Sequence, residues 1–142
     1  CMGFEHVIPE LLKKIYISSH NLIQKNCRID IQGNGKETRA FCYIDDAIDQ
    51  IMKVFENGES GEIYHIGNDT EKNIIELIKD ISNILKKSVN VIPSKLREGS
   101  TMRRCPNIEK VCSLGYINNN NYQIGLKKTI KWYMDYFTQN YE

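Results

Sequence analysis

The sequence lacks paired cysteines, a long apolar run and an excess of charge of either sign. Its five cysteines are odd in number and form no C-x-x-C pair, which argues against a disulfide framework and a zinc site. No apolar run reaches the roughly 18 residues of a membrane span. The net charge of +1 gives no general attraction to nucleic acid or anionic membranes. We therefore expect free thiols, a cytoplasmic location, no nucleic-acid partner and no membrane partner.

Sequence motifs for catalysis are also absent. There is no G-x-G-x-x-G turn for a dinucleotide, no tyrosine followed four residues later by lysine, and no nucleophile elbow or metal-ligand cluster. The sequence therefore predicts no catalytic residue, cofactor site or metal site on this chain. Its 142 residues fit one domain with a real core. The first residue, Cys1 rather than methionine, suggests a fragment of a longer protein.

Apolar periodicity predicts an α/β chain of short strands and about five helices. Helices are predicted at about 7–19, from Asp45 or Asp46 as cap to about 57, at 73–85, at 107–112 and at about 122–137, with strands at 28–32, 62–66 and 89–92. Asn73 and Glu76 have the spacing of a capping box. His65, inside a predicted strand, is expected to be a packed or hydrogen-bonded core residue.

The stretch from Gly33 to Asp46 predicts a glycine turn, an extended run and the start of a helix. Arg39 lies on the extended run, between two rigid elements. A guanidinium is a planar fork of donors that keeps its charge near neutral pH, which suits a phosphate or diphosphate. The alternative is a hairpin in which Arg39 forms an ordinary surface salt bridge.

Further cations follow in the basic loop from Ser94 to Arg104, namely Arg97, Arg103 and Arg104. If the fold brings them to Arg39, they would form a diphosphate clamp in which each charge-assisted bond contributes about 1.5–3 kcal/mol. Otherwise the loop is a solvated basic segment. Glu5 and His6, at a predicted helix start, could orient a sugar hydroxyl or serve as cap and surface residues.

Four ordered blocks resemble the carboxyl-terminal part of the NAD-dependent epimerase/dehydratase family, the extended short-chain dehydrogenases that act on nucleotide sugars. The blocks are GNGKETRAFCYIDD at 33–46, GEIYHIGN at 61–68, RCPNIEK at 104–110 and GLKKTIKWY at 125–133. The pattern is most similar to that of UDP-glucuronate decarboxylases and dTDP-glucose 4,6-dehydratases. Each block alone would be a weak signal, but their order over nearly the whole chain is specific.

The resemblance implies that residues 1–142 are the nucleotide-sugar-binding carboxyl-terminal domain of an extended short-chain dehydrogenase, without its amino-terminal Rossmann domain. In the intact enzyme that domain binds NAD; no cofactor is expected on this chain alone. The expected ligand is a nucleoside-diphosphate sugar gripped by arginines, and the isolated chain is expected to be inactive. The alternative is a non-catalytic module, either a split subunit that docks on a separate Rossmann chain or an inactive remnant.

The family motif also implies roles for individual residues. It implies that Arg39 binds the diphosphate, that Arg97 makes a second phosphate contact and that Arg104 lies near the sugar. The backbone of Ile31 and Gln32 would contact the base. Glu5 and His6 would contact the sugar or the diphosphate. Gln32 replaces a common aromatic residue. In the family, the strand matching 62–66 joins the edge of the Rossmann sheet. Without that sheet its backbone groups lack partners, so a homo-oligomer is expected.

Overall fold

The computed structural model describes residues 3–20, 23–96 and 98–141, which form an α/β fold with five helices and short strands. The helices are α1 (Val7–Ser18), α2 (Ile44–Asn57), α3 (Ile74–Leu85), α4 (Glu109–Cys112) and α5 (Tyr122–Asn140). The strands are β1 (Asn26–Gln32), β2 (Thr38–Ala40), β3 (Glu71–Asn73), β4 (Ser88–Ser94) and β5 (Arg103–Arg104). The predicted fold class, with about five helices, is confirmed.

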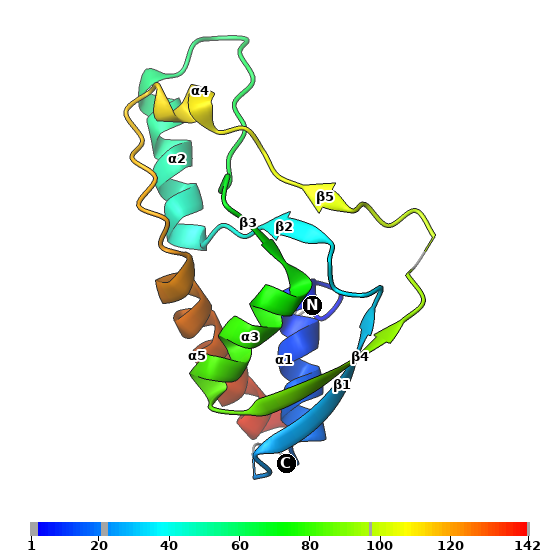
Figure 1. Cartoon of the computed structure of the whole chain (residues 1–142). Coiled ribbons are helices and arrows are strands. Elements are labelled where there is room, and N and C mark those ends of the chain that lie inside the picture. The colour runs from blue at the N-terminus through cyan, green and yellow to red at the C-terminus, as the bar shows by residue number, and fades with distance from the viewer. Residues whose placement is uncertain (1–2, 21–22, 97, 142) are drawn as a thin grey trace.

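The strands form two small sheets. β1 and β4 pair in parallel along their whole length, from Asn26 opposite Ser88 to Gln32 opposite Ser94. The second sheet has the order β3-β2-β5, with β2 antiparallel to β3 and parallel to β5. Figure 1 shows α1, α3 and α5 gathered beside the β1–β4 pair, while α2 and α4 lie together at the far end of the molecule.

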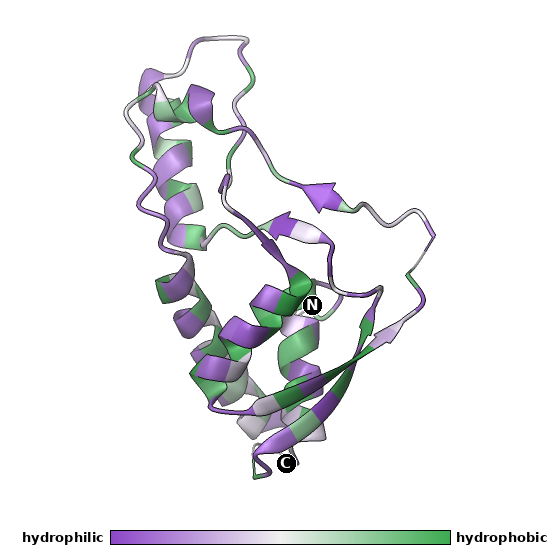
Figure 2. Ribbon diagram, viewed as in Figure 1, coloured by the Kyte–Doolittle hydropathy of each residue, from purple (hydrophilic) through white to green (hydrophobic). Residues whose placement is uncertain are grey.

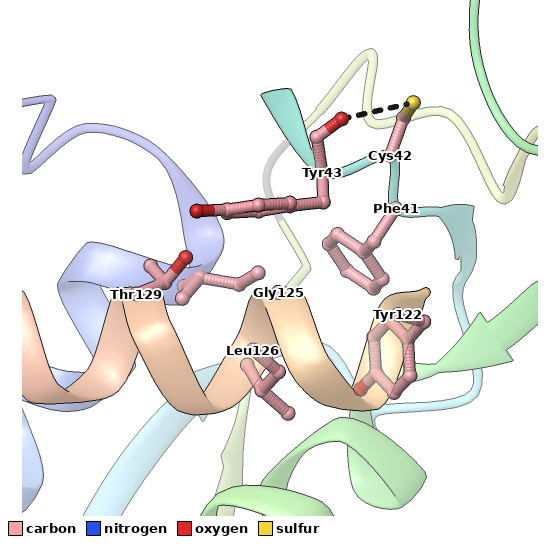
Figure 3. A pocket seen from close by; sticks show the side chains of 8 residues that line it. Phe41, Cys42, Tyr43, Tyr122, Gly125, Leu126 and Thr129 are labelled. Carbon is pink, nitrogen blue, oxygen red and sulfur yellow. Dashed lines mark hydrogen bonds between the residues drawn. The ribbon is translucent and has the colours of Figure 1, made fainter. Parts of the chain in front are cut away.

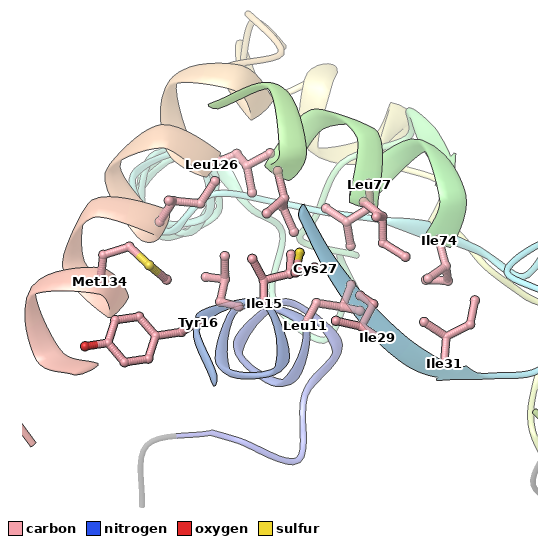
Figure 4. Packing of buried hydrophobic residues seen from close by; sticks show 14 of the residues in the cluster. Leu11, Ile15, Tyr16, Cys27, Ile29, Ile31, Ile74, Leu77, Leu126 and Met134 are labelled. Carbon is pink, nitrogen blue, oxygen red and sulfur yellow. The ribbon is translucent and has the colours of Figure 1, made fainter. Parts of the chain in front are cut away.

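The main core lies among α1, α3, α5 and β1 (Figure 4). β1 alternates strictly, so that Cys27, Ile29 and Ile31 are buried while the residues between them face outward. The helices contribute side chains at helical spacing, and those of Leu12, Ile15, Leu77, Ile81 and Phe137 have no accessible surface. A smaller cluster of Ile108, Val111 and Tyr116 packs α4 against the end of α2.

The first residues of α3 confirm the predicted capping box. The Asn73 side chain accepts the backbone N–H of Glu76 at 2.8 Å, and the Glu76 carboxylate accepts the backbone N–H of Asn73 at 2.9 Å. The next amides are also satisfied, because Ile74 N–H donates to the carbonyl of Glu37 and Ile75 N–H to that of Gly35. The glycine turn before β2 is thereby attached to the start of α3.

Three local predictions are wrong. Residues 62–66 form no strand, and none of residues 63–66 makes a backbone hydrogen bond within the described part of the chain, because no sheet edge lies beside them. His65 is consequently exposed rather than packed. Neither Asp45 nor Asp46 caps α2, which begins one residue earlier at Ile44; Asp46 instead accepts a bond from Asn121 at 2.8 Å.

Several predicted boundaries also shift: β1 begins at Asn26 rather than at 28, and α4 begins at Glu109 rather than at 107. β4 continues through Pro93 to Ser94, which a two-stranded sheet allows because the outer side of β4 needs no backbone donor. α5 runs on to Asn140, and Ile124, predicted on its buried side, is exposed. Among the described helices, none is both long and apolar enough to cross a bilayer.

Candidate functional site

The three-stranded sheet has two faces of different charge. Thr38 lies opposite Arg103 and Arg39 opposite Arg104 in the β2–β5 pair, while Arg39 lies opposite Lys72 in the β2–β3 pair. Because side chains alternate along a strand and opposite residues share a face, Lys72, Arg39 and Arg104 form a row across one face. Thr38 and Arg103 belong to the other face.

The face with Thr38 and Arg103 is neutralised by Glu71. The Thr38 hydroxyl donates to Glu71 Oε2 at 2.6 Å, and Arg103 donates to Glu71 Oε1 from Nη2 at 2.6 Å and from Nε at 2.9 Å. The hydrogen bonds from Thr38 and Arg103 lower the pKa of Glu71, since they favour its charged form. Arg103 is therefore occupied within the chain.

The opposite face carries two arginines without a carboxylate partner. Among the described residues, neither Arg39 nor Arg104 forms an ion pair, whereas Lys72 pairs with Asp80 at 3.0 Å. Arg39 Nη1 donates to the carbonyl of Thr38 at 2.6 Å and lies 3.5 Å from that of Met102. Arg104 Nη2 lies 3.4 Å from Thr101 Oγ1. Neighbouring strands are about 4.8 Å apart, so the register places Arg39 and Arg104 next to each other on this face.

Lys72, on β3, is the third member of the row. Its ammonium lies 4.9 Å from the ring centroid of Tyr122, whose hydroxyl donates to the same Asp80 carboxylate at 2.9 Å. Burial, with the charge of Asp80 beside it, raises the pKa of Tyr122 well above its ordinary value. Asp80 thus neutralises Lys72 and leaves the positive charge of this face on Arg39 and Arg104.

The other predicted site residues lie elsewhere. The side chain of Ile31 is buried in the core, and its carbonyl accepts the Ser94 hydroxyl at 2.9 Å. Gln32 is exposed at the end of β1. Glu5 and His6 are exposed just before α1, and His6 occupies the cap position without a side-chain cap bond. Arg97 lies outside the described residues.

A small cavity that sequence reasoning missed lies between α5 and the segment after β2 (Figure 3). Its volume is about 40 Å³, and Phe41, Tyr43, Tyr122 and Gly125 are among the residues that line it. The ring of Tyr43 lies across Gly125, where a Cβ atom would be 2.4 Å from Tyr43 Cγ. A glycine inside a helical pattern was the available sequence signal for this close approach.

Sequence reasoning also missed Glu37. Its side chain is buried and lines a groove that includes Gly33, Asn34 and Met102, beside the arginine row. Its position between a glycine turn and a strand gave no sign of burial, because glutamate at such a place is usually exposed.

The glycine turn before β2 does not have the form of a dinucleotide-binding turn. The turn at Gly33 and Gly35 runs into β2 rather than into the first turn of a helix, so it offers no cradle for a pyrophosphate. Within the described ranges, no group of three or more His, Cys, Asp and Glu side chains is placed to hold a metal ion. Two arginines without a carboxylate partner on one sheet face are suited to binding an anion.

Comparisons with known proteins show what the chain is similar to. Residues 4–67 match the family model described as the NAD dependent epimerase/dehydratase family. The chain is 31% identical over 141 residues to the dTDP-D-glucose 4,6-dehydratase of Homo sapiens, a match covering 93% of this chain and 39% of that protein. The chain therefore spans about two fifths of the length of this curated relative.

Solved structures share the fold. The structure of RMD from Pseudomonas aeruginosa complexed with NADPH superposes with a TM-score of 0.80 at 16% identity, covering 94% of this chain and 44% of that one. DesIV, a dTDP-glucose 4,6-dehydratase from Streptomyces venezuelae with NAD and TYD bound, gives 0.76 at 26% identity, covering 96% and 40%. The chain belongs to the NAD-dependent epimerase/dehydratase family and corresponds to the carboxyl-terminal part of an extended short-chain dehydrogenase.

Proposed function

We propose that this chain is the nucleotide-sugar-binding portion of an NAD-dependent nucleotide-sugar epimerase, dehydratase or decarboxylase of the cytoplasm. The observation that carries the proposal is the register pair Arg39–Arg104, two guanidinium groups on one sheet face without a described carboxylate partner. Relatives named as dTDP-glucose 4,6-dehydratases support a diphosphate-linked sugar as the ligand. Residues 1–142 would then be one substrate-binding domain.

In this proposal, the two arginines share the negative charge of a diphosphate. A bidentate guanidinium fixes the orientation of a phosphate as well as binding it, and the β2–β5 pairing places the two arginines at neighbouring positions of the sheet. Arg97 and the exposed Glu5, His6 and Gln32 would contact the rest of the nucleotide sugar, together with the backbone at Ile31. NAD, bound by a Rossmann domain that this chain does not contain, would supply the hydride chemistry.

The outer surface of α2 supports a Rossmann domain or subunit as a partner. Ile44, Ile48, Ile51, Met52 and Phe55 form a helical stripe that is exposed to solvent, while the polar Asp46 and Gln50 are buried. Apolar residues recur along α2 in Figure 2. An apolar stripe facing outward is typical of a surface that another protein covers. The unpaired segment 62–66, with Ile63 exposed, follows α2.

A titration of the chain with UDP, dTDP, GDP and CDP, with NAD as control, tests the proposal. We expect at least one nucleoside diphosphate to raise the melting temperature, and NAD to have no effect. Arg39→Ala should weaken that binding about tenfold or more, because it removes charge-assisted hydrogen bonds. The matched control is Arg103→Ala, which removes an arginine from the neighbouring register position on the other face.

Equal affinity of the Arg39→Ala variant and the unmodified chain would rule out the arginine clamp. If none of the four nucleotides binds, the result favours the second candidate function, a non-catalytic module that is either a split subunit or a remnant. The exposed stripe of α2 favours the split subunit among these, since a remnant has no need to keep an apolar docking surface.

A further inference from the structure

The row of Lys72, Arg39 and Arg104 contains one cation that the chain itself neutralises. Lys72 lies opposite Arg39 in the β2–β3 pair, and Arg39 lies opposite Arg104 in the β2–β5 pair, so three cations follow one another across the sheet face. Among the described residues, only Lys72 of these three has a carboxylate partner, with Asp80 Oδ2 at 3.0 Å from its Nζ atom. The row therefore has three cations but only two unbalanced charges.

The fold holds the pair of Lys72 and Asp80 in place. The Tyr122 hydroxyl donates to the same Asp80 Oδ2 atom at 2.9 Å, and the ring of Tyr122 has its centroid 4.9 Å from the Lys72 ammonium. The side chains of Lys72 and Asp80 are 26% and 19% exposed, so salt screens this pair less than a surface pair. By contrast, Lys131 and Asp135 on α5 pair with side chains that are 77% and 58% exposed.

Ligands that contain a diphosphate differ in their charge. A diphosphate that joins a nucleoside to a sugar has one ionised oxygen on each phosphorus, and hence two negative charges. In a free nucleoside diphosphate the terminal phosphate has a second ionisable oxygen with a pKa of about 6, so the total approaches three charges above neutral pH. Because Coulomb attraction is proportional to the charge of the ligand, each unbalanced cation in the row favours the free nucleoside diphosphate more than the sugar-linked one.

We propose that Asp80 determines specificity at this site. By neutralising Lys72, it limits the unbalanced charge of the row to the two charges of a sugar-linked diphosphate. The inference rests on the proposed function, because it takes a nucleoside-diphosphate sugar as the ligand. Asp80 acts through Lys72 and needs no contact with the ligand.

This role has a clear consequence for competition between ligands. A free nucleoside diphosphate has the same base and the same diphosphate as the sugar-linked compound, so the two arginines bind both. A third unbalanced cation would add to the affinity for the free nucleotide, which has one more negative charge. Asp80 removes that advantage without removing an arginine from the row.

Calorimetric titrations with UDP, UDP-glucose, dTDP and dTDP-glucose, at a pH about two units above the terminal phosphate pKa, test the proposal. Asp80→Asn keeps an acceptor for the Tyr122 hydroxyl but releases Lys72 from its ion pair. We expect UDP and dTDP to gain about threefold or more in affinity relative to their sugar-linked counterparts, because one further ligand charge meets one further cation. Added salt should reduce this gain.

Lys72→Met should have the opposite effect, because it leaves the Asp80 charge unbalanced beside the row, so that UDP loses more affinity than UDP-glucose. The double variant Asp80→Asn, Lys72→Met has the original charge and should have the original affinity ratio. Asp135→Asn is the matched control: it releases Lys131 from a similar pair, about 20 Å along α5 from Tyr122, and should leave the ratio unchanged. Both ligands bind the same folded fraction, so a loss of stability alone does not alter their ratio.

The outcomes separate this role from the proposed function. If the ligands bind with the same ratio in the unmodified chain and in Asp80→Asn, the role of Asp80 is wrong while the arginine clamp stands. An equal shift in Asp135→Asn would also overturn it, since net charge alone would then explain the effect. If Asp80→Asn does not fold, the shift expected for Lys72→Met decides. If none of the four ligands binds, the role of Asp80 is overturned, whereas binding of GDP or CDP would still support the proposed function.

Discussion

At the scale of single residues, Gly125 shows how one missing side chain positions the segment after β2. It lies in the second turn of α5, where alanine would ordinarily stabilise a helix by about 1 kcal/mol. The side chain of Tyr43 occupies the space that the alanine Cβ would need, with its Cβ, Cγ and Cδ2 atoms within 2.6 Å. Packing and helix propensity therefore act in opposite directions at this position.

We expect Gly125→Ala to destabilise the chain by about 1–3 kcal/mol, because overpacking outweighs the gain in helix propensity. Urea unfolding followed by circular dichroism measures the change. In the Tyr43→Ala background the obstacle is gone, so the same substitution should become neutral or stabilising. An unchanged stability in the single variant would mean that Tyr43 moves aside without cost.

The candidate site could be predicted only in part at this scale. Arg39 was identified from its place after a glycine turn, and Arg104 from the family motif. Their register was not readable, because β5 has two residues and no alternation to detect. Glu37 escaped detection for a different reason: its burial depends on Gly33 and on the loop around Met102, which lies far along the chain.

At the scale of elements, α3 is the helix whose start is most completely specified by local sequence. Asn73 and Glu76 satisfy each other's backbone groups, and Ile74, Leu77, Ile78 and Ile81 bury one face. Both signals lie in the helix and in the cap residue directly before it, which explains why the sequence predicted it correctly. β1 was equally predictable, since its alternation is visible without knowledge of its partner.

Asn73→Ala should destabilise the chain by about 1 kcal/mol, because the N–H of Glu76 loses its acceptor. Thermal unfolding measures the effect. Asn83→Ala is the matched control: it changes the same residue type on the exposed surface of the same helix, where alanine should be neutral or slightly stabilising. Similar losses in both variants would contradict a specific role for the cap.

Segment 62–66 shows what local pattern cannot supply. Its alternation predicted a strand, yet a strand forms only where another strand offers its backbone groups, and no described segment does so here. The sequence pattern therefore predicts that a segment can form a strand, but whether it does so depends on the segments that lie beside it. The same reasoning applies to α2, whose apolar residues predicted a helix correctly but face outward.

At the scale of the whole molecule, the exposed stripe on α2 governs how the chain behaves in solution. Phe55, at its end, is 84% exposed, and Ile44 is 60% exposed. Because apolar area in contact with water favours association, we expect the chain to self-associate when no other partner covers the stripe. The formation of a homo-oligomer therefore stays a prediction.

Ile51→Glu should shift the chain toward a monomer, since a charge in the centre of the stripe opposes its burial. Sedimentation velocity over a range of concentrations would measure the shift. Ile124→Glu, at an exposed isoleucine on α5, should leave association unchanged. A monodisperse monomer of the unmodified chain at high concentration would contradict the prediction.

The parallel pair of β1 and β4 joins parts of the chain that are far apart in sequence: Ser94, which bonds the carbonyl of Ile31, is 63 residues away. Every element from β2 to α3 lies between the two strands. The entropy of closing so long a loop must be offset before the pair contributes any stability. We therefore expect helices α1 and α3 to form before β1 and β4 pair, so that the pairing of these two strands limits the rate at which the domain folds.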